Sequence, residues 1–182
     1  MVWRIIARVR IVEHSMASRL LAATALAALI AGAAQAAPQT VTAELKNSTG
    51  QTVGAVTLTE APKGVLMRVE AKGLSPGWHG MHFHDKGDCS KSDFTSAGPH
   101  VHGSAAAVHG LLNPAATETG DLPNLHVDAD GAGSTEVFST LVKLSDLRDA
   151  DGSAVVIHAG TDDHTSQPIG GSGPRVACAV IK

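Results

Sequence analysis

Short segments of alternating apolar and polar residues occupy the region between residues 41 and 70. In an extended strand, this alternation places apolar side chains on one face and polar side chains on the other. The segments are enriched in β-branched residues and lie at 41–45, 53–59 and 65–70. Turn-forming residues separate them at 47–50 and 61–64, so the pattern predicts consecutive strands joined by short turns.

The same pattern returns in the last third of the chain, after a long irregular stretch. Strands are predicted at 125–129, 134–138, 154–158 and 176–181. Residues 141–147 include a predicted helical turn. Short strands at close spacing predict an all-β domain, built as an antiparallel sandwich or barrel.

The first 36 residues have a different character. A basic start is followed by Leu20–Ala33, which is mostly alanine and leucine, and then by small residues typical of a cleavage site. These features predict a signal peptide in residues 1–36, with an upstream extension before Met16, and a mature domain in residues 37–182. A membrane anchor is the alternative, but the apolar run is short for a bilayer span. We therefore expect export to a bacterial periplasm without a membrane anchor.

Charge and cysteine content narrow the functional classes. The formal net charge is −3, and residues 1–36 carry four arginines and one glutamate, so the mature domain has a charge of −6. An acidic domain argues against nucleic acid as a partner. The chain has two cysteines, Cys89 and Cys178. In an exported protein the compartment is oxidising, which favours a disulfide between them. Thiolate ligation of a metal is the weaker alternative, because neither belongs to a C-x-x-C pair.

The sequence His82-Phe83-His84 is the strongest candidate for chemistry. On a strand, side chains two residues apart point to the same face, so the two imidazoles would form half of a metal site. Taken alone, the pair could equally be two surface histidines.

Other potential ligands follow in the irregular stretch from Asp85 to Pro123. A loop of this length in a compact domain is usually functional. It contains the potential ligands His100, His102, His109, Glu118 and Asp121, and a later strand ends at His158. Copper and zinc favour imidazole, and a carboxylate can complete such a site. The pattern therefore predicts a metal centre.

Several separated segments resemble the copper/zinc superoxide dismutase family in its bacterial exported form. They are Gly80–His84, Gly87–Cys89, Ser96–His100, Gly120–Asn124, Val156–His158, Asp162-Asp163 and Gly173–Cys178. The resemblance spans nearly all of the mature chain. It implies a Greek-key β-barrel or sandwich of about eight antiparallel strands with long metal-binding loops. It also implies that superoxide is converted to dioxygen and hydrogen peroxide.

The resemblance assigns roles by position. The four copper ligands would be His82, His84, His100 and His158. His100 would also bind zinc, together with His109 and Asp121. Asp162 would hydrogen-bond one histidine of each metal, Cys89 and Cys178 would form the family disulfide, and Arg175 would lie beside the copper. In the implied reaction His100 carries a proton and Arg175 attracts superoxide.

One position departs from the family pattern. A histidine usually stands three residues before the aspartate of Gly120-Asp121, and here that residue is Glu118. Glu118 can ligate zinc in its place. His102 could substitute instead, or the zinc site could be weak or empty. We favour Glu118, since His102 would require the loop after His100 to turn back on itself.

Two other functional classes compete with the enzyme. An exported copper-binding or storage protein on the same barrel would bind metal without significant turnover. A purely structural sandwich would leave the placement of the histidines unexplained. Arg175 favours the enzyme. The sequence shows no readable dimer contact, so a homodimer stays open.

Overall fold

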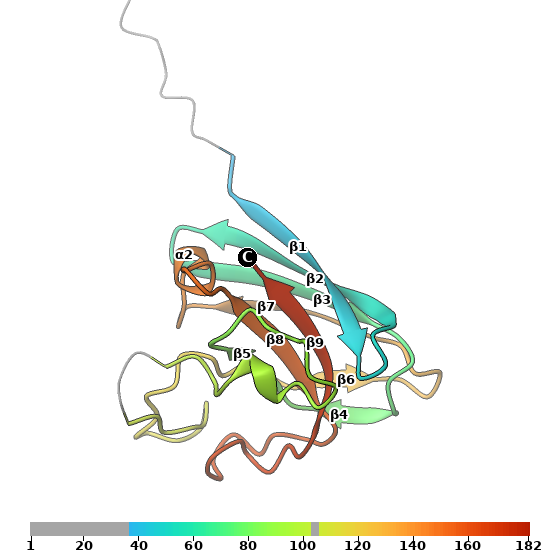
Figure 1. Cartoon of the computed structure of the whole chain (residues 1–182). Coiled ribbons are helices and arrows are strands. Elements are labelled where there is room, and N and C mark those ends of the chain that lie inside the picture. The colour runs from blue at the N-terminus through green and yellow to red at the C-terminus, as the bar shows by residue number, and fades with distance from the viewer. Residues whose placement is uncertain (1–36, 103–105) are drawn as a thin grey trace, which may run out of the picture. The chain divides into compact units, whose positions relative to one another are not determined.

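The computed structural model describes residues 37–102 and 106–182, and Pro38–Lys182 form one compact unit. Its strands are β1 Thr40–Asn47, β2 Thr52–Ala61, β3 Gly64–Ala71, β4 Gly77–His79, β5 Met81–His84, β6 Leu125–Val127, β7 Gly133–Ser139, β8 Ser153–His158 and β9 Arg175–Ile181 (Figure 1). The only helical elements in the described part are the 3₁₀ turn η2, Thr95–Ala97, and α2, Leu144–Leu147. The predicted signal peptide lies outside the described residues.

The strands form two antiparallel sheets. Seven of them pair in the order β5-β8-β9-β1-β2-β3-β7, and β4 pairs with β6. Sequence neighbours are separated where the chain passes from β3 to β4 and from β7 to β8, as expected for a Greek-key arrangement. The predicted all-β antiparallel fold is confirmed.

Burial follows the predicted period of two. On β3, Val65, Met67 and Val69 are buried in the main core, whereas Arg68 and Glu70 are exposed. The core also contains large side chains from the other strands, including Leu45, Leu58, Phe83 and Ile157. Burying such a side chain stabilises the fold by roughly 1.5–3 kcal/mol. The alternation therefore determines which face of the sheet turns inward.

β8 differs because it is buried on both faces. Val155 and Ile157 belong to the main core. Ala154 and Val156 face a second apolar cluster, which includes Phe94 and Cys178. A continuous apolar strand is expected where both faces are covered. This strand ends at a histidine and carries it into the interior.

The strand that carries His82 and His84, β5, directly follows the short strand β4. β4 and β5 are separated by Gly80, whose amide donates to Gly160 O at 2.8 Å. A Cβ atom at Gly80 would lie 2.7 Å from the Ser172 side chain, so the close approach of these segments requires glycine. With this break, the described part of the chain has nine strands where about eight were expected.

Two long loops lie next to the strand ends, residues 85–124 and 159–174. They contain the predicted ligands and partners that the strands do not carry. The predicted helical turn is α2, in which Leu144 and Leu147 are buried. No helix in the described part of the chain is both long and apolar enough to span a bilayer.

Candidate metal centre

Two paired strands position three of the predicted histidines. His82 and His84 lie two residues apart on β5 and project from the same face. β5 pairs with β8, which ends at His158, and the His158 amide donates to Gly80 O at 2.9 Å. Backbone hydrogen bonds therefore set the spacing of the three imidazoles.

His100 joins them from the loop after β5. An isolated backbone bridge connects it to His84, and the next amide, Val101 N, donates to Phe83 O at 2.8 Å. All four histidines are buried. One ring nitrogen of each lies within 4.8 Å of the others, so the structure brings together His82, His84, His100 and His158.

The outer ring nitrogens of three of these histidines are held by other groups. Nδ1 of His84 lies 2.9 Å from Gly98 O, and Nδ1 of His158 lies 2.8 Å from another backbone carbonyl. Nε2 of His82 lies 2.7 Å from Oδ2 of Asp162. A neutral imidazole has one N–H, so these acceptors favour the proton on the outer nitrogen and leave a lone pair on the inner one.

The inner nitrogens are buried and have no hydrogen-bond partner within the described residues. They are Nδ1 of His82 and Nε2 of His84, His100 and His158. One such atom costs roughly 1–3 kcal/mol, so four convergent ones indicate a site that binds a ligand. Burial lowers the pKa of His82 to about 4, of His158 to about 3 and of His84 to about 2. These three neutral imidazoles, with the free Nε2 of His100, fit copper.

A second cluster adjoins the first through His100. Nδ1 of His100 lies 2.8 Å from Oε2 of Glu118, and Nδ1 of His109 lies 3.0 Å from the same oxygen. Oδ1 of Asp121 lies 2.8 Å from Nδ1 of His109 and 3.6 Å from Nδ1 of His100. Ligand atoms of His82, His100, His109 and Asp121 also lie within 4.8 Å of one another. His100 thus presents one nitrogen to each cluster.

Buried carboxylates make the second cluster favourable for positive charge. Burial acts to lower the pKa of His109, but hydrogen bonds with Asp121, Asp162 and Glu118 outweigh it and raise the value to about 11. The pKa of His100 is raised for the same reason, despite burial. Burial acts to raise the pKa values of Glu118 and Asp121, but their imidazole partners lower both. A field that favours a protonated imidazole also favours a cation, and imidazoles with carboxylates fit Zn²⁺.

Comparison with known proteins identifies the family of this chain. The family model of copper/zinc superoxide dismutase matches residues 52–181. The chain belongs to the copper/zinc superoxide dismutase family. Superoxide dismutase [Cu-Zn] of Caulobacter vibrioides is 58% identical over 147 residues, covering 78% of this chain and 84% of the relative. Superoxide dismutase [Cu-Zn] of Escherichia coli is 38% identical over 169 residues, covering 86% and 95%.

Solved structures give the same family. The Cu/Zn superoxide dismutase from Brucella abortus matches with a TM-score of 0.67 and 31% identity, covering 79% of this chain and all of the other. A SOD-like protein from Bacillus subtilis matches with a TM-score of 0.69 and 34% identity, covering 78% and 97%.

In this member of the dismutase family, Asp162 connects the two clusters. Its Oδ2 lies 2.7 Å from Nε2 of His82, and its Oδ1 lies 3.1 Å from Nε2 of His109. The carboxylate is fully buried, and its pKa is lowered because these two hydrogen bonds outweigh the effect of burial. Asp162 therefore contacts one histidine of each cluster, as the resemblance implied.

Two residues that support the site were not predicted from the sequence. The Asn124 side chain exchanges hydrogen bonds with the backbone N–H and C=O of Asp162, both at 2.9 Å. The Gln167 side chain does the same with His109, at 2.9 and 2.8 Å. Asn124 stands in one of the family-like segments, but its role depends on where the 159–174 loop lies.

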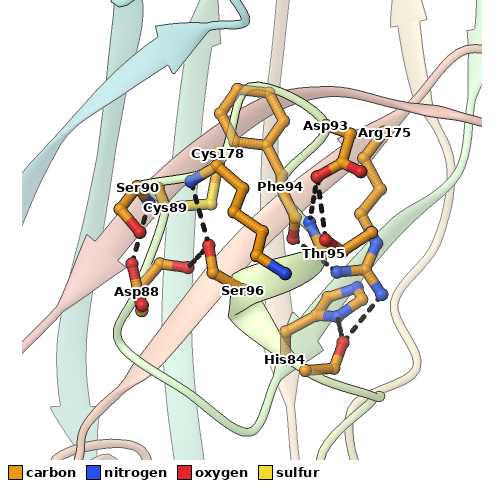
Figure 2. Close-up of a disulfide and its surroundings, with 12 residues drawn as sticks. His84, Asp88, Cys89, Ser90, Asp93, Phe94, Thr95, Ser96, Arg175 and Cys178 are labelled. Atoms are coloured by element: carbon orange, nitrogen blue, oxygen red, sulfur yellow. Dashed lines mark hydrogen bonds between the residues drawn. A yellow bond between two sulfur atoms is a disulfide. The ribbon is translucent and has the colours of Figure 1, made fainter.

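Arg175 begins β9 and binds the loop that carries His100 (Figure 2). Its guanidinium donates to Phe94 O at 2.5 Å and to Gly98 O at 2.7 Å. Gly98 O also lies 2.9 Å from Nδ1 of His84. Arg175 and His158 line a surface cavity of about 280 Å³ together with Asp93, Thr95, Ile169, Gly173 and Pro174. One of the four clustered histidines, His158, therefore lines this cavity.

The predicted disulfide is confirmed. Cys89 and Cys178 are bonded, with a Cα–Cα distance of 6.0 Å and a sequence separation of 89 (Figure 2). The bond ties the loop after β5 to the middle of β9, close to the contacts of Arg175.

Two further histidines have defined positions near the centre. The ring nitrogens of His79 lie 2.6 Å from His158 O and 2.8 Å from Ser75 O, so His79 supports the backbone of a neighbouring histidine. His102 forms an isolated backbone bridge with Glu118.

Proposed function

We propose that the protein dismutates superoxide at a copper centre bound by four histidines, with zinc bound beside it. The copper ligands are His82, His84, His100 and His158. Three of the zinc ligands are His100, His109 and Asp121. The observation that carries this assignment is the convergence of four buried imidazole nitrogens that have no hydrogen-bond partner among the residues that the structure describes.

The overall reaction converts two superoxide anions and two protons into one dioxygen and one hydrogen peroxide. Copper, when bound, supplies the one-electron redox chemistry that takes an electron from one superoxide and gives it to the next. His82, His84 and His158 hold their protons on the outer nitrogens and stay neutral. His100 differs, because its Nδ1 faces a carboxylate and its Nε2 is free to hold a proton for the reduced product.

Arg175 supplies a positive charge at the cavity that contains His158. The mature domain has a net charge of −6, so superoxide is repelled weakly at long range. A local positive charge in a low-dielectric cleft can nevertheless raise association rates by roughly 10- to 1,000-fold. The placement of Arg175 beside a small opening favours catalysis over copper storage.

We also propose that the protein is exported to the periplasm and acts there without a membrane anchor. The support for this is the arrangement of residues 1–36, with a basic start, an apolar segment and small residues before residue 37. Mass measurement of the mature protein from periplasmic extract tests the proposal. An N-terminus near residue 37 is expected, and an uncleaved chain in the membrane fraction contradicts it.

Metal analysis and a superoxide assay on one purified sample test the function. The wild-type protein should bind copper and accelerate superoxide decay. His158→Ala should lose copper and activity, because one of four converging nitrogens is removed. His126→Ala is the control, because His126 is half-exposed on β6 and contacts Trp78 and Asp128 rather than the cluster. Copper without turnover would favour storage, and full copper and rate in His158→Ala would overturn the ligand assignment.

A further inference from the structure

We propose that Glu118 is the fourth zinc ligand, so that zinc is held by two imidazoles and two carboxylates. The inference rests on the proposed function, since it concerns the second metal of that centre. The ligand atoms are Nδ1 of His100, Nδ1 of His109, Oε2 of Glu118 and Oδ1 of Asp121.

The geometry places one carboxylate oxygen between two imidazoles. Oε2 of Glu118 lies 2.8 Å from Nδ1 of His100 and 3.0 Å from Nδ1 of His109. Oδ1 of Asp121 lies 2.8 Å from the same nitrogen of His109. The Glu118 side chain is only 7% exposed. Four-coordinate zinc accepts nitrogen and carboxylate oxygen together, so the four atoms form a complete donor set.

Backbone pairing holds Glu118 in this position. Its amide lies 3.2 Å from Val108 O, next to His109. The following amides, Thr119 N and Gly120 N, both donate to Val101 O, next to His100. The segment that carries Glu118 is therefore bound to the segments that carry both imidazoles. A Cβ atom at Gly120 would lie 2.4 Å from Phe83 O, so this close packing requires glycine.

His102 is the competing ligand. Its backbone pairs with that of Glu118. The Glu118 carboxylate already contacts the imidazoles of His100 and His109. Glu118 can therefore complete the site without a change in the loop.

Glu118 makes the zinc site more negative than a third histidine would. The family pattern has a histidine where this chain has Glu118, so a neutral ligand is replaced by an anion. Glu118 Oε2 lies 2.8 Å from His100, whose other nitrogen belongs to the copper set. An added negative charge at this distance should favour the more positive copper state and lower the copper potential.

The test uses the full mature protein loaded with copper and zinc and then desalted. Zinc and copper per chain are measured for the wild type, Glu118→Gln, Glu118→His and His102→Ala. Glu136→Gln is the matched control, because it removes an exposed carboxylate from β7. Cobalt(II) in place of zinc gives an absorption spectrum that reports the ligand set directly. Circular dichroism verifies that each variant is folded.

We expect Glu118→Gln to bind zinc at least about tenfold more weakly while it retains copper. Glu118→His should bind zinc and give a changed cobalt spectrum, which shows that the rest of the site is intact. His102→Ala and Glu136→Gln should match the wild type. Wild-type zinc content and an unchanged cobalt spectrum in Glu118→Gln would overturn the proposal, as would loss of zinc in His102→Ala alone.

The wild type separates this inference from the proposed function. If it binds copper and zinc and dismutates superoxide, and Glu118→Gln keeps its zinc, then only the role of Glu118 is wrong. If the wild type binds copper without zinc, the second metal and Glu118 are both wrong, while copper catalysis stands. If it binds neither metal, the proposed function itself fails.

Discussion

Each of the four histidines of the proposed copper site has one nitrogen that faces the cluster and one that faces the rest of the protein. His84 and His158 are held by backbone carbonyls, and His82 is held by a carboxylate. His100 is the exception, because its second nitrogen faces the other cluster. The outer contacts fix ring orientation before metal binds, so less order must be imposed by the metal.

Substitution of Asp162 tests whether the orientation of the rings contributes to metal affinity. Asp162→Asn keeps the size of the side chain, but its amide NH₂ must face either His82 Nε2 or His109 Nε2, where an acceptor stood before. We expect affinity for both metals to fall by about 10- to 100-fold. Competitive titration with chelators measures this. Asp163→Asn is the control, because Asp163 is exposed and accepts from nearby loop residues. Unchanged affinity for both metals would contradict the role of Asp162.

At the scale of elements, the loop of residues 85–98 contacts three features at once, namely Cys178 through the disulfide, Arg175 and His84. Cys89 fixes one part of the loop to β9. Phe94 O and Gly98 O accept hydrogen bonds from Arg175, and Gly98 O also faces His84 (Figure 2). Phe94 itself is buried in the cluster beneath β8. The loop therefore forms one wall of the cavity and holds a ligand at the same time.

Arg175→Ala should slow the second-order reaction with superoxide and flatten its decline with ionic strength, because salt screens the attraction that Arg175 provides. Arg175→Lys should keep the salt dependence, because it keeps the charge, although it donates fewer hydrogen bonds to the loop. Pulse radiolysis at several salt concentrations measures both properties. Arg148→Ala, which removes an exposed arginine, is the control. An unchanged rate and slope in Arg175→Ala would exclude the residue from steering.

Asp93 should slow the reaction with superoxide, which is the opposite of the effect of Arg175. It lines the same cavity as Arg175 and His158, and hydrogen bonds from Thr95 lower its pKa, so it is anionic where an anion must enter. Asp93→Asn should raise the rate about twofold at low salt, with a smaller effect at high salt. Asp88→Asn is the matched control, since Asp88 lies in the same loop but does not line the cavity. A slower rate in Asp93→Asn would contradict this interpretation.

The elements and the candidate ligands could be predicted from local pattern and motif order. The period of two on β3 and the spacing of His82 and His84 on β5 depend only on strand geometry. The break at Gly80 could not be predicted, because it depends on Ser172 and Gly160, far away in sequence. The contacts of Asn124 and Gln167 depend on loop paths, which no local period determines.

At the scale of the whole molecule, the β1–β9 pairing connects the first strand to the last. The pairing is short, Lys46 with Cys178 and Asn47 with Ala177. Cys178 lies in this pairing and also forms the disulfide. The disulfide therefore links the loop of residues 85–98 to β9, and β9 in turn pairs with β1.

Removal of the disulfide should lower the stability of the fold, mainly because the unfolded chain is no longer restricted. A bond that closes a loop of 89 residues limits the unfolded chain, and its loss should lower the free energy of unfolding by about 4–5 kcal/mol. Cys89→Ser combined with Cys178→Ser tests this in denaturant, with metal-free proteins compared so that metal binding does not contribute. Ser90→Ala, in the same loop, is the control. The metal-loaded double variant should also show a weaker dependence of rate on salt, because the loop that Arg175 binds is then held to β9 by hydrogen bonds alone. Equal unfolding midpoints for the double variant and the wild type would show that strand pairing alone holds the loop.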